Sequence, residues 1–178
     1  MAYLLAEYVA EKNKQYYTTD LLITAILHDV IEDTELTKDM VAQIFSQSIA
    51  DKVEDLTRIK FDQKVTAGET VNMLFAQYKQ DVLHVKLFDR LHNAQTIGAI
   101  SPEKAKKIIN ETVVYFLPLA SYLDAFEVKQ KLIRICDNIN FPKQPACQCQ
   151  ENQVNGFCYC NSPFSLVLRN IINQTHMQ

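Results

Sequence analysis

Apolar residues recur every three or four positions along most of the chain, and this spacing predicts a series of amphipathic helices. No stretch shows the alternation of apolar and polar residues that is typical of a half-buried strand. We therefore expect an all-α fold in which the helices pack as a bundle. The predicted helices cover residues 1–14, 21–34, 37–45, 48–59, 69–78, 81–97, 101–122 and 124–138.

Several helix boundaries are marked by residues that favour them. Thr37 and Ser101 are well placed to cap the helices that follow, and the proline after Ser101 strengthens that second start. Asp124 and Glu127 have the spacing of a capping box, which predicts that the last core helix begins there. Pro118 lies inside a predicted helix and is expected to kink it, because its ring removes one backbone hydrogen bond.

Residues 21–34 form the stretch around which the chain is organised. Its first seven residues are almost all apolar, which predicts a buried helix. If the helix continues, His28 lies over Glu32, and Asp29 lies over Asp33. Burying unpaired carboxylates costs several kcal/mol, so this group needs a positive partner. A divalent metal ion is a partner that satisfies all of these side chains together.

Composition narrows the functional classes. The length of 178 residues suits one medium domain with an appendage. The formal net charge of −3 does not indicate the basic surface that binds nucleic acid or an anionic membrane. No apolar run approaches the roughly 20 residues that span a bilayer. The first residues lack the pattern of a signal peptide. We therefore expect a cytoplasmic protein that binds neither nucleic acid nor membrane.

The second half of the candidate site lies in the predicted helix of residues 81–97. Asp89, Asn93 and Thr96 stand at i, i+4 and i+7, which places them on one polar stripe. Asp89 could instead form a surface ion pair, and His28 alone could be a satisfied core histidine, but the apolar neighbours of Asp89 disfavour a surface pair. One histidine with carboxylates favours manganese or iron over a structural zinc ion.

Two longer strings carry a resemblance to a known family. Residues 27–34 read LHDVIEDT and residues 85–93 read VKLFDRLHN, and both resemble the hydrolase domain of the RelA/SpoT homologues. These proteins are HD-type metal-dependent phosphohydrolases that degrade the alarmone (p)ppGpp. Glu111-Thr112 with residues 115–120 resembles the next signature of that family. The resemblance covers about residues 1–141, and a change of composition at residues 140–145 marks a boundary. We therefore expect a hydrolase domain over residues 1–140 and a separate tail over residues 141–178.

The resemblance implies hydrolysis of the 3′-pyrophosphate ester of (p)ppGpp, giving GDP or GTP and pyrophosphate. It implies one Mn²⁺ ion held by His28, Asp29 and Asp89. Glu32 and Asp33 are then expected to orient and deprotonate the attacking water. This assignment agrees with general chemistry, because a bound metal lowers the pKa of water and a nearby carboxylate can take the proton.

The resemblance also implies contacts with the guanine nucleotide. Asn93 and Thr96 are the residues expected to touch it. Lys86 and Arg90 are candidates for adding positive charge toward the phosphates, although each could equally be a solvated surface residue. All four residues are therefore candidates for binding the substrate.

The chain departs from the family pattern in two places. The family's first metal ligand is a histidine in a His-Pro pair, and the register here reaches Met1 a few residues too late to include it. We therefore expect an N-terminal truncation, an upstream start, or a separate polypeptide that supplies the missing helix. The family's Glu-Asn and Arg-Lys pairs are also replaced. At those positions this chain has Gly68, Glu69, Val71 and Asn72.

These departures leave three hypotheses for the function. The first is metal-dependent (p)ppGpp hydrolysis, weakened or lost in this chain. The second is a catalytically inactive, degenerate paralogue that acts as a nucleotide- or partner-binding module. The third is a metal-dependent hydrolase acting on another nucleotide, which the changes at residues 68–72 would allow.

The tail contains two Cys-x-Cys pairs. Four thiolates could hold one Zn²⁺ ion tetrahedrally, although an unselected tail would look the same. Cys136, which precedes the tail, is expected to be a buried apolar thiol. A short apolar helix predicted at residues 163–173 is expected to pack on the core or on another subunit. The four candidate zinc ligands are Cys147, Cys149, Cys158 and Cys160.

Overall fold

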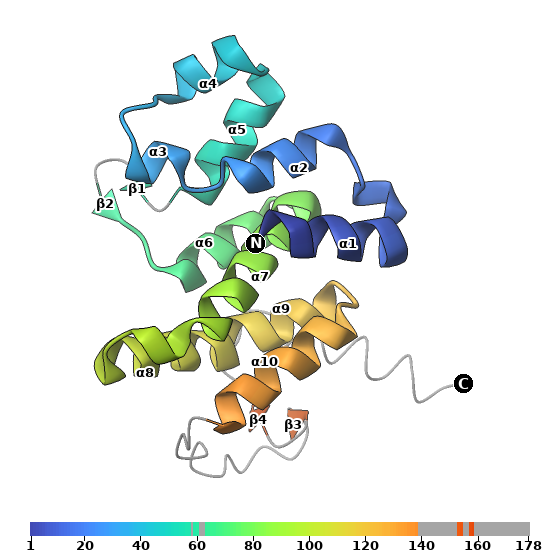
Figure 1. Ribbon diagram of the computed structural model, residues 1–178, viewed down its shortest axis with the longest axis vertical. Helices are drawn as coiled ribbons and strands as arrows, with labels where there is room; N and C mark the ends of the chain where they lie inside the picture. The colour runs from blue at the N-terminus through green and yellow to red at the C-terminus, as the bar shows by residue number, and fades with distance from the viewer. Residues whose placement is uncertain (58, 61–62, 139–152, 155–156, 159–178) are drawn as a thin grey trace. The chain divides into compact units, whose positions relative to one another are not determined.

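The computed structural model describes residues 1–57, 59–60, 63–138, 153–154 and 157–158 (Figure 1). These residues are predominantly helical, so the predicted all-α fold is confirmed. Two antiparallel pairs of two-residue strands are the extended elements within the described ranges. Among the same residues, no helix is both long enough and apolar enough to cross a membrane. The predicted helix near the C-terminus lies outside the described residues.

The chain divides into two compact units, residues 1–89 and 90–178, and the division falls within one helix. The elements of the first unit are α1 (Ala2–Lys12), η1 (Lys14–Tyr16), α2 (Thr19–Ile26), α3 (Val30–Asp33), α4 (Lys38–Ile44), α5 (Gln47–Leu56), β1 (Ile59–Lys60), β2 (Gln63–Lys64), α6 (Ala67–Ala76) and most of α7 (Gln80–Gln95). Within this unit α5 packs against α2, α4 and α6, and α1 packs against α2.

The second unit contains the end of α7 and the helices that follow it. There η3 is a π-helical turn that contacts both α8 and α9, and α9 packs against α10. The elements of this unit are η2 (Ile97–Ala99), α8 (Pro102–Glu111), η3 (Thr112–Phe116), α9 (Leu117–Tyr122), α10 (Phe126–Asn138), β3 (Gln153–Val154) and β4 (Phe157–Cys158).

Side-chain caps set several helix starts. The predicted caps at Thr37 and Ser101 are confirmed, because each hydroxyl accepts a hydrogen bond from a backbone amide three residues later. Thr66 and Glu69 form a complete capping box at the start of α6. Each such cap stabilises its helix by about 1 kcal/mol. The helix predicted at residues 69–78 therefore begins two residues earlier, at Ala67.

One prediction at the end of α9 is wrong. The capping box at Asp124 does not form, because Asp124 has a left-handed φ of 52° and α10 begins only at Phe126. An N-cap residue needs an extended backbone, which a positive φ does not provide. The helix predicted over residues 101–122 is present as α8, η3 and α9, which follow one another without a break. Pro118 lies in the first turn of α9, after the π-helical turn η3. The kink at Pro118 stays a prediction.

The single buried helix predicted for residues 21–34 is also wrong, because α2 ends at Ile26 and α3 starts at Val30. In an unbroken helix the carbonyl of Ala25 would accept from the amide of Asp29. Instead the Nδ1–H of His28 donates to that carbonyl, at 3.0 Å. The histidine side chain thus replaces a backbone donor where the helix ends.

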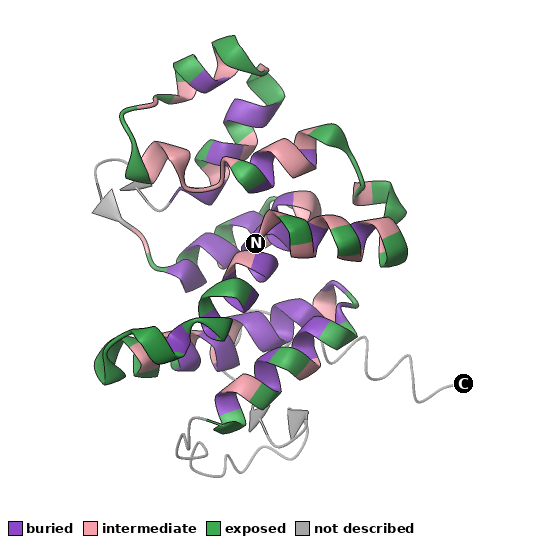
Figure 2. Cartoon of the chain, in the orientation of Figure 1, coloured by how far each residue is buried: buried purple, intermediate pink, exposed green. Residues whose placement is uncertain are grey.

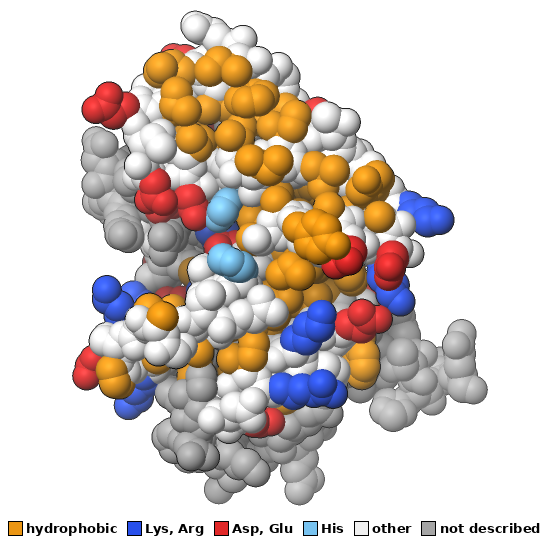
Figure 3. Space-filling model, in the orientation of Figure 1, with side chains coloured by type: hydrophobic (Ala, Val, Ile, Leu, Met, Phe, Trp, Pro, Cys, Tyr) orange, Lys and Arg blue, Asp and Glu red, His pale blue; other side chains and the backbone are white. Residues whose placement is uncertain are grey.

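The apolar run at residues 21–27 is only partly buried. Ile26 at the end of α2 has 68% of its surface exposed, and Ile44 at the end of α4 has 63% exposed. Figure 3 shows hydrophobic side chains gathered over this end of the first unit. Inside the unit a cluster of Val41, Ile49, Ala50 and Val53 holds α4 against α5. Apolar residues of α2 and α3 pack at the edge of that cluster.

The central helix α7 is buried along most of its length (Figure 2). Residues 82–88 are all buried, so this part of the helix is covered on every side. The leucine ridge that the periodicity predicts on this helix is confirmed, and Leu83 and Leu87 have no exposed surface. Two buried residues of α7 are cations, Lys86 and Arg90.

Candidate metal centre

Three side chains from distant parts of the sequence meet in the first unit. His28 and Asp29 lie in the turn between α2 and α3, and Asp89 lies on α7. The Nε2 atom of His28 is 2.8 Å from an oxygen of Asp29 and 3.7 Å from Oδ1 of Asp89. One ligand atom from each residue lies within 4.8 Å of the other two. The sequence predicts these same three residues as the metal ligands, and the fold brings them together.

The orientation of His28 is set by the end of α2. Its Nδ1–H donates to the carbonyl of Ala25, so its other ring nitrogen faces the two carboxylates. Histidine ligands in metal sites commonly donate their second ring N–H to such an acceptor, which fixes the tautomer. The bond that interrupts the helix therefore also aims Nε2 at the candidate site.

The electrostatic environment of this group favours positive charge. Burial of His28 by itself lowers the pKa of its imidazole, but the hydrogen bond and charge of Asp29 and the charge of Asp89 outweigh burial and raise that pKa. The side chains of His28 and Asp89 have only 21% and 17% of their surface exposed. The centre is thus a partly buried position between two carboxylates that a cation can occupy.

The donor set fits a divalent ion of the size of Mn²⁺ or Mg²⁺. Ligand atoms bound at about 2.1 Å lie roughly 3.0 Å apart when adjacent and about 4.2 Å apart when opposite each other. The separations of 2.8 and 3.7 Å between Nε2 of His28 and the two carboxylate oxygens are close to this range. One imidazole with two carboxylates is a mixed nitrogen and oxygen set, which favours manganese or iron over a structural zinc ion.

Glu32 and Asp33 do not join the three-residue group. Both lie in α3, and their backbone amides donate to the carbonyl of Asp29 at 3.0 and 2.9 Å. Glu32 is half-buried and Asp33 is exposed. The predicted convergence of three carboxylates at the end of one helix is therefore wrong. It is Asp89, and not a neighbour in the same stretch, that completes the described group. The catalytic roles predicted for Glu32 and Asp33 stay predictions.

The two cations predicted to face phosphates have protein partners. Nζ of Lys86 lies 3.4 Å from the carbonyl oxygen of Leu56 and 4.0 Å from Oδ2 of Asp89. Arg90 forms an ion pair with Glu111 at 2.7 Å. The same guanidinium also donates to the carbonyl of Ile108 and lies over the ring of Phe116. Both side chains are buried, so the alternative that they are solvated surface residues is wrong.

Asn93 follows Asp89 on α7, and Thr96 comes directly after that helix. Asn93 is exposed. The hydroxyl of Thr96 donates to the carbonyls of His92 and Asn93, both at 3.3 Å. These hydrogen bonds satisfy carbonyl groups in the last turn of α7. Contact of Asn93 and Thr96 with a nucleotide stays a prediction.

The cysteine predictions have different outcomes. Cys136 is buried and free, as predicted, and burial raises the pKa of its thiol to about 11. The proposed zinc ligands lie outside the described residues, apart from the backbone of Cys158 in β4.

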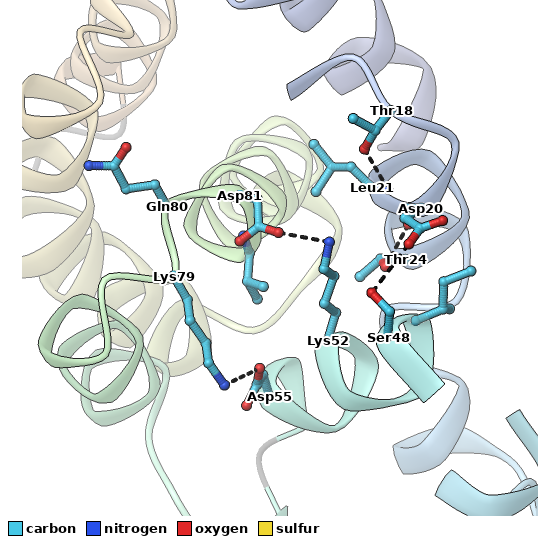
Figure 4. Close-up of polar contacts among 12 residues, drawn as sticks. Thr18, Asp20, Leu21, Thr24, Ser48, Lys52, Asp55, Lys79, Gln80 and Asp81 are labelled. Atoms are coloured by element: carbon cyan, nitrogen blue, oxygen red, sulfur yellow. Dashed lines mark hydrogen bonds and ion pairs between the residues drawn. The ribbon is translucent and has the colours of Figure 1, made fainter. Parts of the chain in front are cut away.

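A separate hollow of about 270 Å³ lies at the start of α7. Its lining includes Lys52 of α5 and Asp81 of α7, which form an ion pair at 2.9 Å (Figure 4). Nearby, Lys79 pairs with Asp55 at 2.6 Å. These contacts hold α5 against the start of α7. None of the three candidate metal ligands lines this hollow.

Sequence reasoning missed the groups that orient the metal ligands. The carbonyl of Ala25, which fixes His28, leaves no signal in the amino-acid sequence because it belongs to the backbone. The carbonyl of Leu56, which faces Lys86, is hidden for the same reason. The sequence did offer one sign of this contact. Lys86 stands between apolar residues of the predicted helix, and a buried lysine almost always has a partner within the protein.

Comparison with known proteins identifies clear relatives. Residues 2–126 match the HD domain family. The chain is 38% identical over 130 residues to the bifunctional (p)ppGpp synthase/hydrolase SpoT of Escherichia coli K12, covering 70% of this chain and 18% of that protein. It is 36% identical over 118 residues to a probable guanosine-3′,5′-bis(diphosphate) 3′-pyrophosphohydrolase of Synechocystis, covering 63% of this chain and 16% of that protein.

A third relative is the GTP pyrophosphokinase rsh of Brucella ovis, which is 36% identical over 114 residues. That match covers 61% of this chain and 15% of the relative. The chain therefore spans less than a fifth of the length of these relatives.

Proposed function

Because this chain belongs to the HD domain family and is related to the (p)ppGpp hydrolase domain of the RelA/SpoT homologues, we propose that it is a metal-dependent phosphohydrolase. The observation that carries this proposal is the approach of Asp89 on α7 to His28 and Asp29 in the turn after α2. The side chain of Asp89 is 17% exposed and that of Asp29 is 44% exposed, and a cation between these two carboxylates would offset the burial of their charge. The ring nitrogen of His28 that faces both carboxylates would then be the third ligand.

The proposed substrate is (p)ppGpp. Two of the relatives are named as (p)ppGpp or guanosine bis(diphosphate) hydrolases, which supports this choice for the shared segment. In the proposed reaction a water oxygen bonds to the phosphorus attached to the 3′ oxygen, and the bond between that phosphorus and the 3′ oxygen breaks. The 3′ oxygen takes a proton, and GDP or GTP and pyrophosphate are released.

The side chains would divide this work. His28, Asp29 and Asp89 would hold Mn²⁺, which when bound supplies positive charge to the phosphate and lowers the pKa of a coordinated water. The carboxylate of Glu32 would accept the proton of the attacking water, and Asp33 would help to orient that water. These two residues lie in α3, one helical turn beyond Asp29.

The nucleotide itself would be held further along α7. Asn93 on α7 and Thr96 directly after its last residue would contact it. Three protein ligands leave coordination positions for water and for phosphate, as catalytic metal sites require. A further ligand from a separate chain would be compatible with the same arrangement.

The test combines metal binding with product release. The electron paramagnetic resonance signal of free Mn²⁺ reports binding, and pyrophosphate release from ppGpp reports turnover. Asp89→Asn should abolish tight Mn²⁺ binding and turnover together. The matched control is Asp81→Asn, which alters a carboxylate on the same helix that pairs with Lys52 outside the candidate centre. Loss of Mn²⁺ binding in both variants, or in neither, would contradict the proposal.

The same assay separates the competing hypotheses. Binding of ppGpp without turnover would indicate an inactive nucleotide-binding module. Turnover of GTP or dGTP but not of ppGpp would indicate a hydrolase for another nucleotide. The observation that keeps this last hypothesis in view is the side chain of Asn72 on α6. Its Oδ1 atom is buried without a hydrogen-bond partner among the described residues, in the segment where the chain departs from the family pattern.

A further inference from the structure

Lys86 is a buried cation on α7, with 4% of its surface exposed. A buried ammonium needs partners that replace its hydration, because burying an unpaired charge costs several kcal/mol. One partner is the carbonyl oxygen of Leu56, 3.4 Å away, which belongs to the last turn of α5. Carbonyls at a helix C-terminus have no acceptor role inside the helix and carry partial negative charge. This carbonyl therefore anchors the ammonium to α5.

The other partner is the carboxylate of Asp89. Nζ of Lys86 lies 4.0 Å from Oδ2, and Nε2 of His28 lies 3.7 Å from Oδ1. The two oxygens of one carboxylate thus face in different directions, one toward the buried lysine and one toward the candidate metal centre. If the side chain of Asp89 rotated freely, neither of its two oxygens would be held toward the metal centre.

We propose that Lys86 is a positioning residue for Asp89, which holds Oδ2 so that Oδ1 is presented to the metal ion. The proposal rests on the proposed function, since it needs the metal centre. It assigns Lys86 to the protein scaffold and away from the phosphates of a substrate. Its chemical basis is charge-assisted contact from an ammonium that α5 holds in place. Partners of this kind commonly change metal affinity about 10- to 100-fold when they are removed.

The test is the Mn²⁺ affinity of Lys86→Met, measured without nucleotide by electron paramagnetic resonance. Methionine keeps most of the length and the apolar stem of lysine but removes the ammonium. We expect the affinity to fall about 10-fold or more. The matched control is Lys52→Met, which removes a lysine that also contacts an aspartate of α7, Asp81, at 2.9 Å. The control should bind Mn²⁺ as the unchanged protein does.

The direction of the change distinguishes three roles. A lysine that merely repels the cation predicts tighter Mn²⁺ binding in Lys86→Met, and a phosphate ligand predicts unchanged binding. Either result would overturn the proposal. Lys86→Arg keeps the charge and several donors, so it should bind Mn²⁺ more tightly than Lys86→Met. Equal weakness of the two variants would also count against a positioning role.

Two controls keep the outcome interpretable. Unfolding in EDTA is measured for every variant, and Lys86→Gln replaces Lys86→Met if the latter does not fold. The unchanged protein and Asp89→Asn are measured in parallel. If both bind Mn²⁺ alike, the proposed function fails and this inference fails with it. If Asp89→Asn loses the ion and Lys86→Met retains full affinity, only the inference about Lys86 fails.

Discussion

The ion pair between Arg90 and Glu111 joins the end of α7 to α8 inside the second unit. The Nη2 and Oε2 atoms are 2.7 Å apart, and the two side chains have only 7% and 17% of their surface exposed. We predict that Glu111→Gln destabilises this unit. The substitution keeps the shape of the side chain and an acceptor oxygen, but it leaves the guanidinium of Arg90 without a counter-charge in a buried position.

The expected cost follows from these contacts. Removing one partner of a fully buried pair typically costs 3–5 kcal/mol, roughly, because an uncompensated charge remains. Arg90 keeps its hydrogen bond to the carbonyl of Ile108 and its contact with the ring of Phe116. The amide of the new Gln can still accept a hydrogen bond. We therefore expect a loss of about 2 kcal/mol in the free energy of unfolding.

The assay is urea unfolding followed by circular dichroism, applied to a double-mutant cycle. Arg90→Met should destabilise the unit by a similar amount, because it leaves the carboxylate of Glu111 unpaired. The combination of Arg90→Met with Glu111→Leu should come within about 1 kcal/mol of the unchanged protein, since an apolar pair of similar volume can replace a buried ion pair. Strictly additive losses, or a Glu111→Gln cost below about 0.5 kcal/mol, would refute this account of the pair.

Three further predictions concern other parts of the chain. Burial lowers the pKa of His84, and the Gln80 carbonyl and Asp81 offset this only in part, so below about pH 6.5 the unfolded chain binds a proton that the folded chain excludes. The raised pKa of His28 acts in the opposite sense over this range, so the contribution of His84 is measured as the difference between the unchanged protein and His84→Asn. Between about pH 7.5 and pH 5.5 the free energy of unfolding of the unchanged protein should fall relative to that of His84→Asn, as urea titrations at both pH values would reveal. Thr66→Ala removes the capping box of α6 and should cost about 1 kcal/mol in the same assay, and no change would mean that the cap is not needed. Burial raises the pKa of the Cys136 thiol to about 11, so mass spectrometry should find Cys136 alkylated by iodoacetamide at neutral pH only after unfolding.

The environment of His84 illustrates why that pH dependence is expected. Its Nδ1–H donates to the carbonyl of Gln80 at 2.7 Å, and its Nε2 accepts from the side-chain amide of Asn13 at 3.2 Å. The ring of Tyr16 lies 4.6 Å away. A second proton on His84 would face the donor of Asn13, so protonation and the folded arrangement oppose each other.

Local features of the sequence were enough to predict most of the helices. The periodicity of apolar residues identified α1, α4, α5 and α7 because burial of one stripe and backbone hydrogen bonding both act over one or two turns. The caps at Thr37 and Ser101 were predictable for the same reason. The end of α2 was not predictable, because it depends on the direction taken by one side chain, that of His28.

The identities of the three candidate ligands were also determined by the sequence alone, since the LHDVIEDT and VKLFDRLHN strings contain His28, Asp29 and Asp89. Only the tertiary structure decided that Glu32 and Asp33 stay outside this group and that Lys86 lies on the other side of Asp89. These outcomes depend on how the turn after α2 and the end of α5 meet α7, and on backbone carbonyls that cannot be read from a sequence. Local spacing specifies which residues can share a helix face, whereas the packing of helices far apart in the chain decides which faces meet.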